Sequence, residues 1–116
     1  PQQLDRDKMR GAIFENMIVM EAIKHRYNMG LEGGVFFYRD SNQNEVDLLI
    51  KQEGELTAIE VKSSMTYSSS FEKALTQIEG WIKTPISKKA IVYSGDFENT
   101  SGNINLINYR HISSIL

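Results

Sequence analysis

The period of the apolar residues changes along this chain, and that change constrains the fold more than any other feature. Between Asp7 and about Met29 the large apolar side chains are three or four residues apart, which predicts an amphipathic α-helix whose apolar stripe faces the core. The helical period ends at the two glycines of residues 33–34, and segments rich in β-branched and aromatic residues follow. The stripe consists of Met9, Ile13, Met17, Met20, Ile23 and Tyr27.

Five strands and a second helix are expected after the first helix. Helical spacing returns near Ser70, where Ser69 and Glu72 have the spacing of a capping box, and Pro85 ends the second helix. The order helix, three strands, helix, strand, strand predicts an α/β domain with a mixed sheet between helices, whose third and fourth strands are parallel. The strands are predicted at residues 35–40, 45–51, 56–64, 88–95 and 104–111.

The composition favours one intracellular domain without thiol chemistry. The 116 residues suit a single domain over 1–116, and 0 Cys exclude disulfides, thiolate zinc sites and a cysteine nucleophile. No run approaches the roughly 18 apolar residues of a membrane helix, and no signal peptide is evident, so we expect a cytoplasmic protein without a membrane. The net charge of -2 argues against DNA binding by basic residues alone, whereas a metal-bridged phosphate site stays open.

Charged residues interrupt two of the predicted strands. Hairpin pairing about Gly54 would place Asp47 roughly opposite residues 60–62. The Asp47 carboxylate would then lie near the Glu60 carboxylate and the Lys62 ammonium. Alternation of side chains puts Glu60 and Lys62 on one face of their strand. In the strand at 45–51 the same alternation predicts one face with Glu45, Asp47 and Leu49 and the other with Val46, Leu48 and Ile50.

This cluster suits a divalent cation. Mg²⁺ prefers carboxylate oxygens, which Asp47 and Glu60 supply, and an ammonium such as that of Lys62 can serve a metal-adjacent water during attack on a phosphate. The same spacing also fits a lysine–carboxylate pair that only neutralises itself.

The first helix adds a carboxylate to the hypothesis. Glu15 has no basic residue three or four positions away, so we expect it to meet a metal, Lys62 or a backbone amide elsewhere in the fold. Asn16 projects into the apolar stripe and is interpreted as satisfying a buried backbone group.

Three segments resemble the PD-(D/E)xK nuclease superfamily. They are GAIFEN at 11–16, YRDSNQNEVDLLI at 38–50 and IEVKSS at 59–64, with Val46 where the name-giving motif has proline. More narrowly, the chain resembles the uncharacterised domain found C-terminal to AAA-type ATPases of bacteria and archaea. The resemblance implies a restriction-endonuclease-like α-β-β-β-α-β core, here with an extra C-terminal strand, in the C-terminal part of a longer ATPase protein.

The resemblance also implies a site and an activity. Asp47, Glu60 and the backbone carbonyl of Val61 would bind Mg²⁺ or Mn²⁺, Lys62 would be the catalytic lysine, and Glu15 would be an acidic catalytic residue and a further candidate ligand. The implied reaction is hydrolysis of phosphodiester bonds in DNA, with RNA as an alternative substrate. The competing hypothesis is a catalytically silent module of the same fold that binds nucleic acid or a partner ATPase domain.

Weaker candidates for nucleic-acid contacts are Ser63 and Ser64, which follow the predicted third strand, and Gln77 on the second helix. The chain contains no GxxxxGK[ST] loop, so we expect no nucleotide bound by this chain and an ATPase domain upstream. The sequence makes no prediction of oligomeric state.

Overall fold

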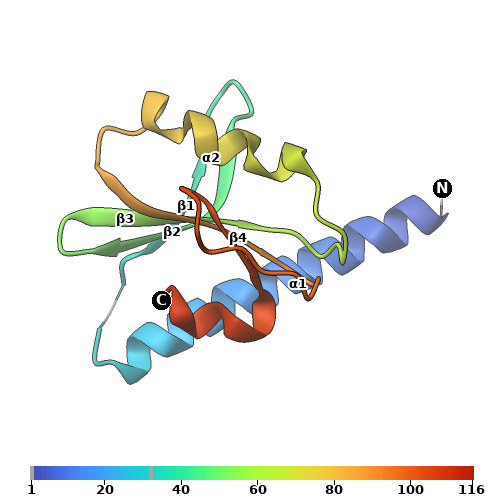
Figure 1. Ribbon diagram of the computed structural model, residues 1–116, viewed down its shortest axis with the longest axis horizontal. Coiled ribbons are helices and arrows are strands. Elements are labelled where there is room, and N and C mark those ends of the chain that lie inside the picture. Colours follow the sequence, from blue (N-terminus) through green and yellow to red (C-terminus); the bar gives the residue numbers. More distant parts are fainter. Residues whose placement is uncertain (1, 32) are drawn as a thin grey trace.

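The computed structural model describes residues 2–31 and 33–116 and has the predicted α/β order, including the C-terminal strand. Three short 3-10 helices accompany the main elements, at Ser69–Glu72 and Ile78–Gly80 on either side of α2 and at Tyr109–Ser114 after β5. The main elements are α1 (Gln2–Asn28), β1 (Val35–Arg39), β2 (Glu45–Gln52), β3 (Glu55–Val61), α2 (Lys73–Gln77), β4 (Ile86–Tyr93) and β5 (Asn105–Asn108) (Figure 1).

The five strands form one mixed sheet in the order β1-β2-β3-β4-β5. The first three strands are an antiparallel meander, and β3, β4 and β5 are parallel, which confirms the predicted crossover through α2. The β2–β3 hairpin turns on two residues with positive φ, Glu53 (53°) and Gly54 (81°), as a type I′ turn requires. This turn pairs Gln52 with Glu55 and thereby sets the register of the whole hairpin.

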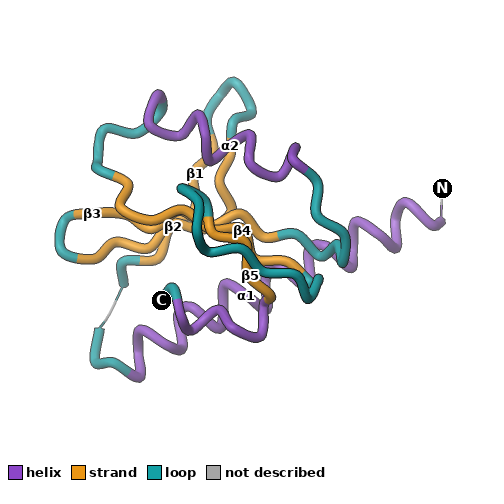
Figure 2. The backbone as a smooth tube through the Cα atoms, viewed as in Figure 1, coloured by secondary structure: helices purple, strands orange, loops and turns teal. Residues whose placement is uncertain are grey.

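Helices cover both faces of the sheet. In Figures 1 and 2, α2 lies over one face, and α1 lies across the other face with the C-terminal 3-10 helix beside it. The core under α1 is built around Ile18 and Ala22, and the core under α2 around Leu75 and Ile78. Within the described residues no helix is long and apolar enough to span a membrane.

A bulge in β2 breaks the predicted alternation of side chains. Phe36 pairs with Leu49 and Tyr38 with Val46, so two steps along β1 correspond to three along β2. As a result Val46 packs into the core under α2 while Leu48 packs into the core under α1, although they are two residues apart. The prediction that Val46, Leu48 and Ile50 share one face was therefore wrong at Val46.

The second helix and the last strand are shorter than predicted. Only Lys73–Gln77 is α-helical, and Glu72 at its N-cap makes no side-chain cap bond, so the predicted capping box of Ser69 and Glu72 is not formed. Ser68 caps the preceding 3-10 helix, where its Oγ accepts from the Ser70 N–H at 3.4 Å. The Thr76 hydroxyl donates to the Lys73 carbonyl within this helix and competes with its regular bonding. The last strand stops at Asn108, whose side chain accepts from the Arg110 N–H at 2.9 Å and starts the C-terminal 3-10 helix.

The apolar stripe of the first helix does not face the core. Its six residues are 41 to 73% exposed, and α1 buries the opposite side, where Ile18, Ala22 and Arg26 contact the rest of the domain. Both sides of α1 carry apolar residues, and only the side with the small Ala22 fits closely against the sheet. Asn16 is exposed as well, so its predicted role toward a buried backbone group was wrong.

Candidate functional site

Where β2 and β3 separate, side-chain carboxylates take the place of backbone carbonyls as acceptors of backbone N–H hydrogen bonds. The hairpin ladder runs from the turn as far as the pair Leu48–Ile59. Beyond it, the Asp47 N–H donates to Glu60 Oε1 at 3.3 Å, and the Val61 N–H donates to Asp47 Oδ2 at 2.8 Å. The structure thus brings Asp47 and Glu60 together, each accepting a bond from the opposite strand. We call this place the β2–β3 junction.

Lys62 lies beside Glu60 on the side of the sheet that α2 covers. Its Nζ is 3.9 Å from Glu60 Oε2 and 5.5 Å from the centre of the Phe71 ring. Glu60 is only 7% exposed, whereas the Lys62 side chain is 38% exposed, so the ammonium lies at the edge of the site and Glu60 within it. An anion and an aromatic face therefore hold the lysine from two directions.

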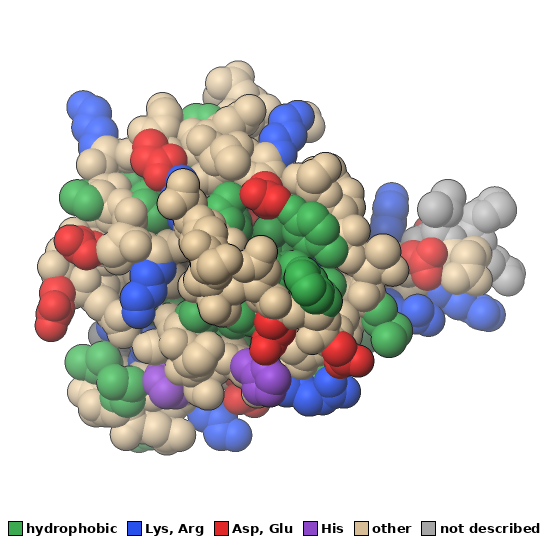
Figure 3. All heavy atoms as spheres, in the orientation of Figure 1, with side chains coloured by type: hydrophobic (Ala, Val, Ile, Leu, Met, Phe, Trp, Pro, Cys, Tyr) green, Lys and Arg blue, Asp and Glu red, His purple; other side chains and the backbone are tan. Residues whose placement is uncertain are grey.

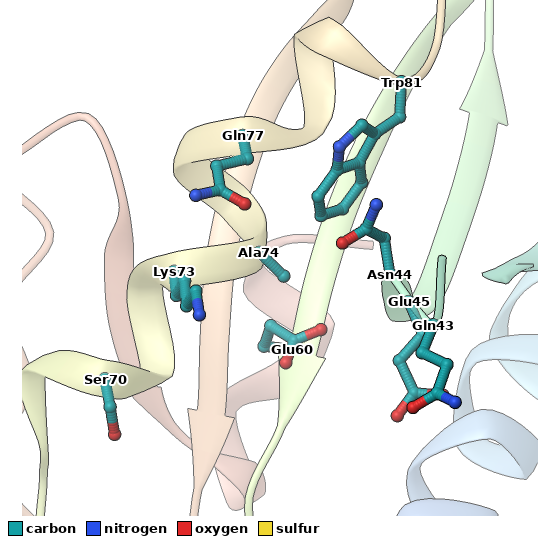
Figure 4. Close-up of a pocket in the computed structure, with 9 residues that line it drawn as sticks. All are labelled: Gln43, Asn44, Glu45, Glu60, Ser70, Lys73, Ala74, Gln77 and Trp81. Carbon is teal, nitrogen blue, oxygen red and sulfur yellow. The ribbon is translucent and has the colours of Figure 1, made fainter. Parts of the chain in front are cut away.

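Glu60 opens into a pocket of about 240 Å³ between the sheet and α2. Figure 4 shows Glu60 below Ala74, with Lys73 and Gln77 reaching toward the space from α2 and Trp81 closing it opposite. The pocket is lined by Gln43, Asn44, Glu45, Glu60, Ser70, Lys73, Ala74, Gln77 and Trp81.

Glu15 meets Asp47 on the other side of the sheet. Both side chains line a smaller pocket of about 200 Å³ between α1, β1 and β2, with Val19, Phe36 and other apolar neighbours. Asp47 therefore lies between the two sides, because it shares this pocket with Glu15 while its carboxylate accepts from Val61 beside Glu60. Against the effect of burial, the charge of Lys62 acts to lower the pKa of all three carboxyl groups, Glu60, Asp47 and Glu15. The two backbone-to-carboxylate bonds at the junction connect the two sides.

The junction disfavours negative charge. Burial, then the nearby charge of Asp47, raises the pKa of Glu60 to about 7, although Lys62 acts against the shift. Burial also raises the pKa of Asp47 despite the bond from Val61, and burial followed by Asp47 raises the pKa of Glu15. A cation bound here would relieve the desolvation and the mutual repulsion of these three carboxyl groups.

The oxygen atoms at the β2–β3 junction are of the kind that binds a hard cation. The Val61 N–H points toward β2, and in an extended strand the carbonyl of a residue points the same way, so the Val61 oxygen faces the side of Asp47. Two carboxylates and one carbonyl suit Mg²⁺ or Mn²⁺. Across the part of the chain that the structure describes, however, no three acidic, His or Cys side chains are already gathered for a metal.

A family model described as a domain of unknown function (DUF4143) matches residues 10–112, which include Glu15, Asp47, Glu60 and Lys62. This chain is a DUF4143 domain. The match is compatible with the resemblance to a domain C-terminal to ATPases and does not test the resemblance to PD-(D/E)xK nucleases. No curated protein and no solved structure matched the chain.

The weaker candidates of the DUF4143 domain lie apart from one another. Ser63 is half-buried and faces Gly11 of α1, where its Oγ is 3.9 Å from the position a Cβ on that glycine would occupy. Ser64 Oγ bonds both the carbonyl (2.8 Å) and the N–H (3.0 Å) of Thr66, so it stabilises a turn. Gln77 is exposed at the mouth of the Glu60 pocket.

Sequence reasoning missed Lys73 and Trp81 as parts of the DUF4143 site. Lys73 lies four residues before Gln77, a helical spacing that places both on one side of α2. The Trp81 ring stacks on Tyr38 of β1, with ring centres 5.8 Å apart and planes 8° from parallel. Because that contact joins residues 43 positions apart in the sequence, no local pattern predicts it.

Basic and acidic side chains are scattered together over the face of the DUF4143 domain in Figure 3, and both kinds lie on the projecting end of α1. This face therefore has no broad basic surface. A phosphate would have to be bound through local groups such as Lys62, Lys73 and a metal.

Proposed function

We propose that this DUF4143 domain is a Mg²⁺- or Mn²⁺-dependent nuclease of the PD-(D/E)xK type that hydrolyses phosphodiester bonds of DNA. The observation that carries the proposal is the meeting of Asp47, Glu60 and Lys62 where β2 and β3 separate. Evolved proteins seldom bury carboxyl groups in a central strand with raised pKa values unless the site uses them.

Each residue has a role that its surroundings support. Asp47, Glu60 and the Val61 carbonyl would hold the metal, and Glu15 would face it from α1 across the smaller pocket. A bound metal would supply positive charge to the phosphate and lower the pKa of a water. Lys62, held between Glu60 and Phe71, would orient the attacking water and stabilise charge on the phosphate.

The pocket under α2 offers the substrate a place to bind. Lys73 and Gln77 would contact the nucleic-acid backbone there, next to Glu60. Ser63 and Ser64 remain weaker proposals, because their hydroxyl groups lie against α1 and within a turn.

The test is metal titration of the domain followed by cleavage assays on single-stranded, duplex and branched DNA and on RNA. We expect Mg²⁺ or Mn²⁺ to raise the melting temperature and to activate cleavage of DNA. Glu60→Gln should abolish both effects, and Glu55→Gln, an exposed carboxylate on the same strand, should abolish neither. Absence of any metal response in the parent protein would contradict the proposal.

A second candidate is a catalytically silent module that binds nucleic acid or a partner ATPase. The observation that favours it is that Asp47 and Glu60 already accept backbone N–H bonds and Glu60 already faces Lys62, so the charges have partners without a metal. Binding of DNA without metal-dependent cleavage, in the same assays, would select this candidate.

We also propose, from the resemblance, that this domain belongs to a longer cytoplasmic ATPase protein and follows its ATPase domain. The native reading frame tests this directly. A Walker A loop upstream of these residues would support it, and a frame that encodes only the 116 residues would contradict it.

A further inference from the structure

The outer face of α1 exposes large apolar side chains that the domain does not cover. Met9 and Ile13 are each 64% exposed, Met20 is 54% exposed and Tyr27 is 73% exposed. Single exposed apolar residues are common on protein surfaces, whereas a continuous row along a helix of 27 residues marks an interface.

The row has the spacing of a coiled-coil seam. If Asn16 takes the place of Met17, which then lies on the flank, successive residues are separated by 4, 3, 4, 3 and 4 positions, which is the heptad pattern of a two-stranded coiled coil. Ile18 and Ala22, which bind α1 to the sheet, lie on the opposite side of the helix. The seam consists of Met9, Ile13, Asn16, Met20, Ile23 and Tyr27.

We propose that α1 forms a parallel, in-register coiled coil with α1 of a second copy of this chain. A partner helix gains more from this α1 than from a free peptide, because packing on the sheet already holds α1 helical and the cost of nucleating it is removed. The first turns of α1 also project beyond the sheet (Figure 1). The proposal does not depend on nuclease activity.

Asn16 selects the parallel orientation. The spacing puts Met9, Asn16 and Ile23 at d positions of the heptad. In a parallel pair in register, d residues face each other, so Asn16 faces Asn16 of the partner subunit and the two amides can meet within the seam. In the antiparallel pair that superimposes the two seams, Met9 lies opposite Tyr27 and Asn16 lies opposite Met20 of the other chain. The amide would then lose water without gaining a partner, which is unfavourable.

Charges beside the seam select the same orientation. Asp5 and Arg10 are exposed on opposite flanks of the seam and five residues apart, which is the spacing of attractive flanking pairs in parallel coiled coils. A parallel dimer therefore contains this pair twice, and these two attractive pairs flank the position where Arg6 meets Arg6 of the partner subunit. The antiparallel dimer would instead place Arg10 near Lys24 of the other chain twice, where like charges repel.

The first test is the association state of the 116-residue chain by sedimentation equilibrium. We expect a dimer whose dissociation constant rises at least about 100-fold, equivalent to about 2.7 kcal/mol, in Met20→Glu. Met65→Glu changes a still more exposed methionine outside the seam, 75% exposed against 54% for Met20, and should leave the dimer intact. Circular dichroism should show both variants folded, because each side chain points to solvent in the single domain. A parent chain that stays monomeric at all concentrations, or a dimer that Met20→Glu leaves unchanged, overturns the proposal.

The second test fixes the orientation, and the absence of native cysteine among the described residues makes it simple. Met9→Cys should form a disulfide between two identical subunits on mild oxidation, because parallel helices place residue 9 beside residue 9. Mixing Met9→Cys with Tyr27→Cys should give no preferred mixed disulfide. A mixed disulfide in place of the Met9→Cys homodimer would show antiparallel helices and overturn the proposed pairing.

Discussion

The β2–β3 junction and the outer face of α1 are unusual in opposite ways, because the junction buries charged groups and the helix face exposes apolar ones. At the junction, Glu60 and Asp47 are carboxylates inside the fold, whereas on α1 side chains such as Ile13 and Met20 are apolar groups in water. The junction tolerates its charges because each carboxylate accepts a backbone N–H that the diverging strands leave free. The face of α1 has no such compensation within the described residues.

The two regions would be stabilised by different additions from outside the domain. Desolvated carboxyl groups would be stabilised by a cation, and exposed apolar groups would be stabilised by another protein surface. The first region therefore suits chemistry and the second suits assembly.

The largest effect is expected at Lys62. If the junction is catalytic, Lys62→Met should lower the metal-dependent cleavage rate by roughly 10²- to 10⁴-fold, the range for loss of a group that assists proton transfer. Lys88→Met, an exposed lysine on β4, is the matched control and should cleave at the parent rate. Equal rates for the two variants would remove Lys62 from the mechanism.

The two sides of α1 should respond differently to the same substitution. Ile18→Ala deletes a side chain that is 1% exposed and should lower the free energy of unfolding by about 2–5 kcal/mol. Ile13→Ala deletes one that is 64% exposed and should change it by less than about 0.5 kcal/mol in dilute, monomeric protein. Chemical denaturation at low protein concentration measures both. Similar losses would mean that α1 buries the Ile13 side within the domain.

The metal-free domain should lose stability as the pH rises from about 4.5 to about 7. The pKa of Glu60 is about 7 in the folded state and 4.5 in the reference state, so the folded protein holds the extra proton over this interval. The expected loss is at most about 3 kcal/mol, from about 1.4 kcal/mol per pKa unit. Urea unfolding across this pH range should show the slope in the parent and a flatter profile in Glu60→Gln. Parallel profiles would place the pKa of Glu60 near its ordinary value.

The smallest effect on metal-free stability is expected for Glu60→Gln at neutral pH. An empty metal site holds carboxylates that repel each other, so removing one charge should leave the melting temperature unchanged or higher. In the parent, metal at 100 times its dissociation constant should raise the free energy of unfolding by about 2.7 kcal/mol, and in Glu60→Gln this stabilisation should vanish. If Glu60 instead serves mainly as the partner of Lys62, the variant leaves an ammonium unpaired and should melt well below the parent. That loss, with no metal response in the parent, would favour the silent module.

Much of the site could be predicted because a short turn controls it. The two-residue turn at Glu53 and Gly54 determines the hairpin register, and counting back from it places Asp47 opposite Glu60. The division of the site into two pockets could not be predicted. It follows from the bulge in β2, which depends on how β1 pairs with it, and the residues of the bulge have no signal of their own.

The sequence by itself determined the order of helices and strands, the parallel step from β3 to β4 and the hairpin register, because each depends on local periodicity, turn residues or a short connection. Only the tertiary structure decided which side of α1 is buried. Both sides present apolar residues at helical spacing, so period alone cannot choose between them. The sheet accepts the side on which Ala22 lets the helix approach and Ile18 fills the space, and the larger side chains of the seam remain outside.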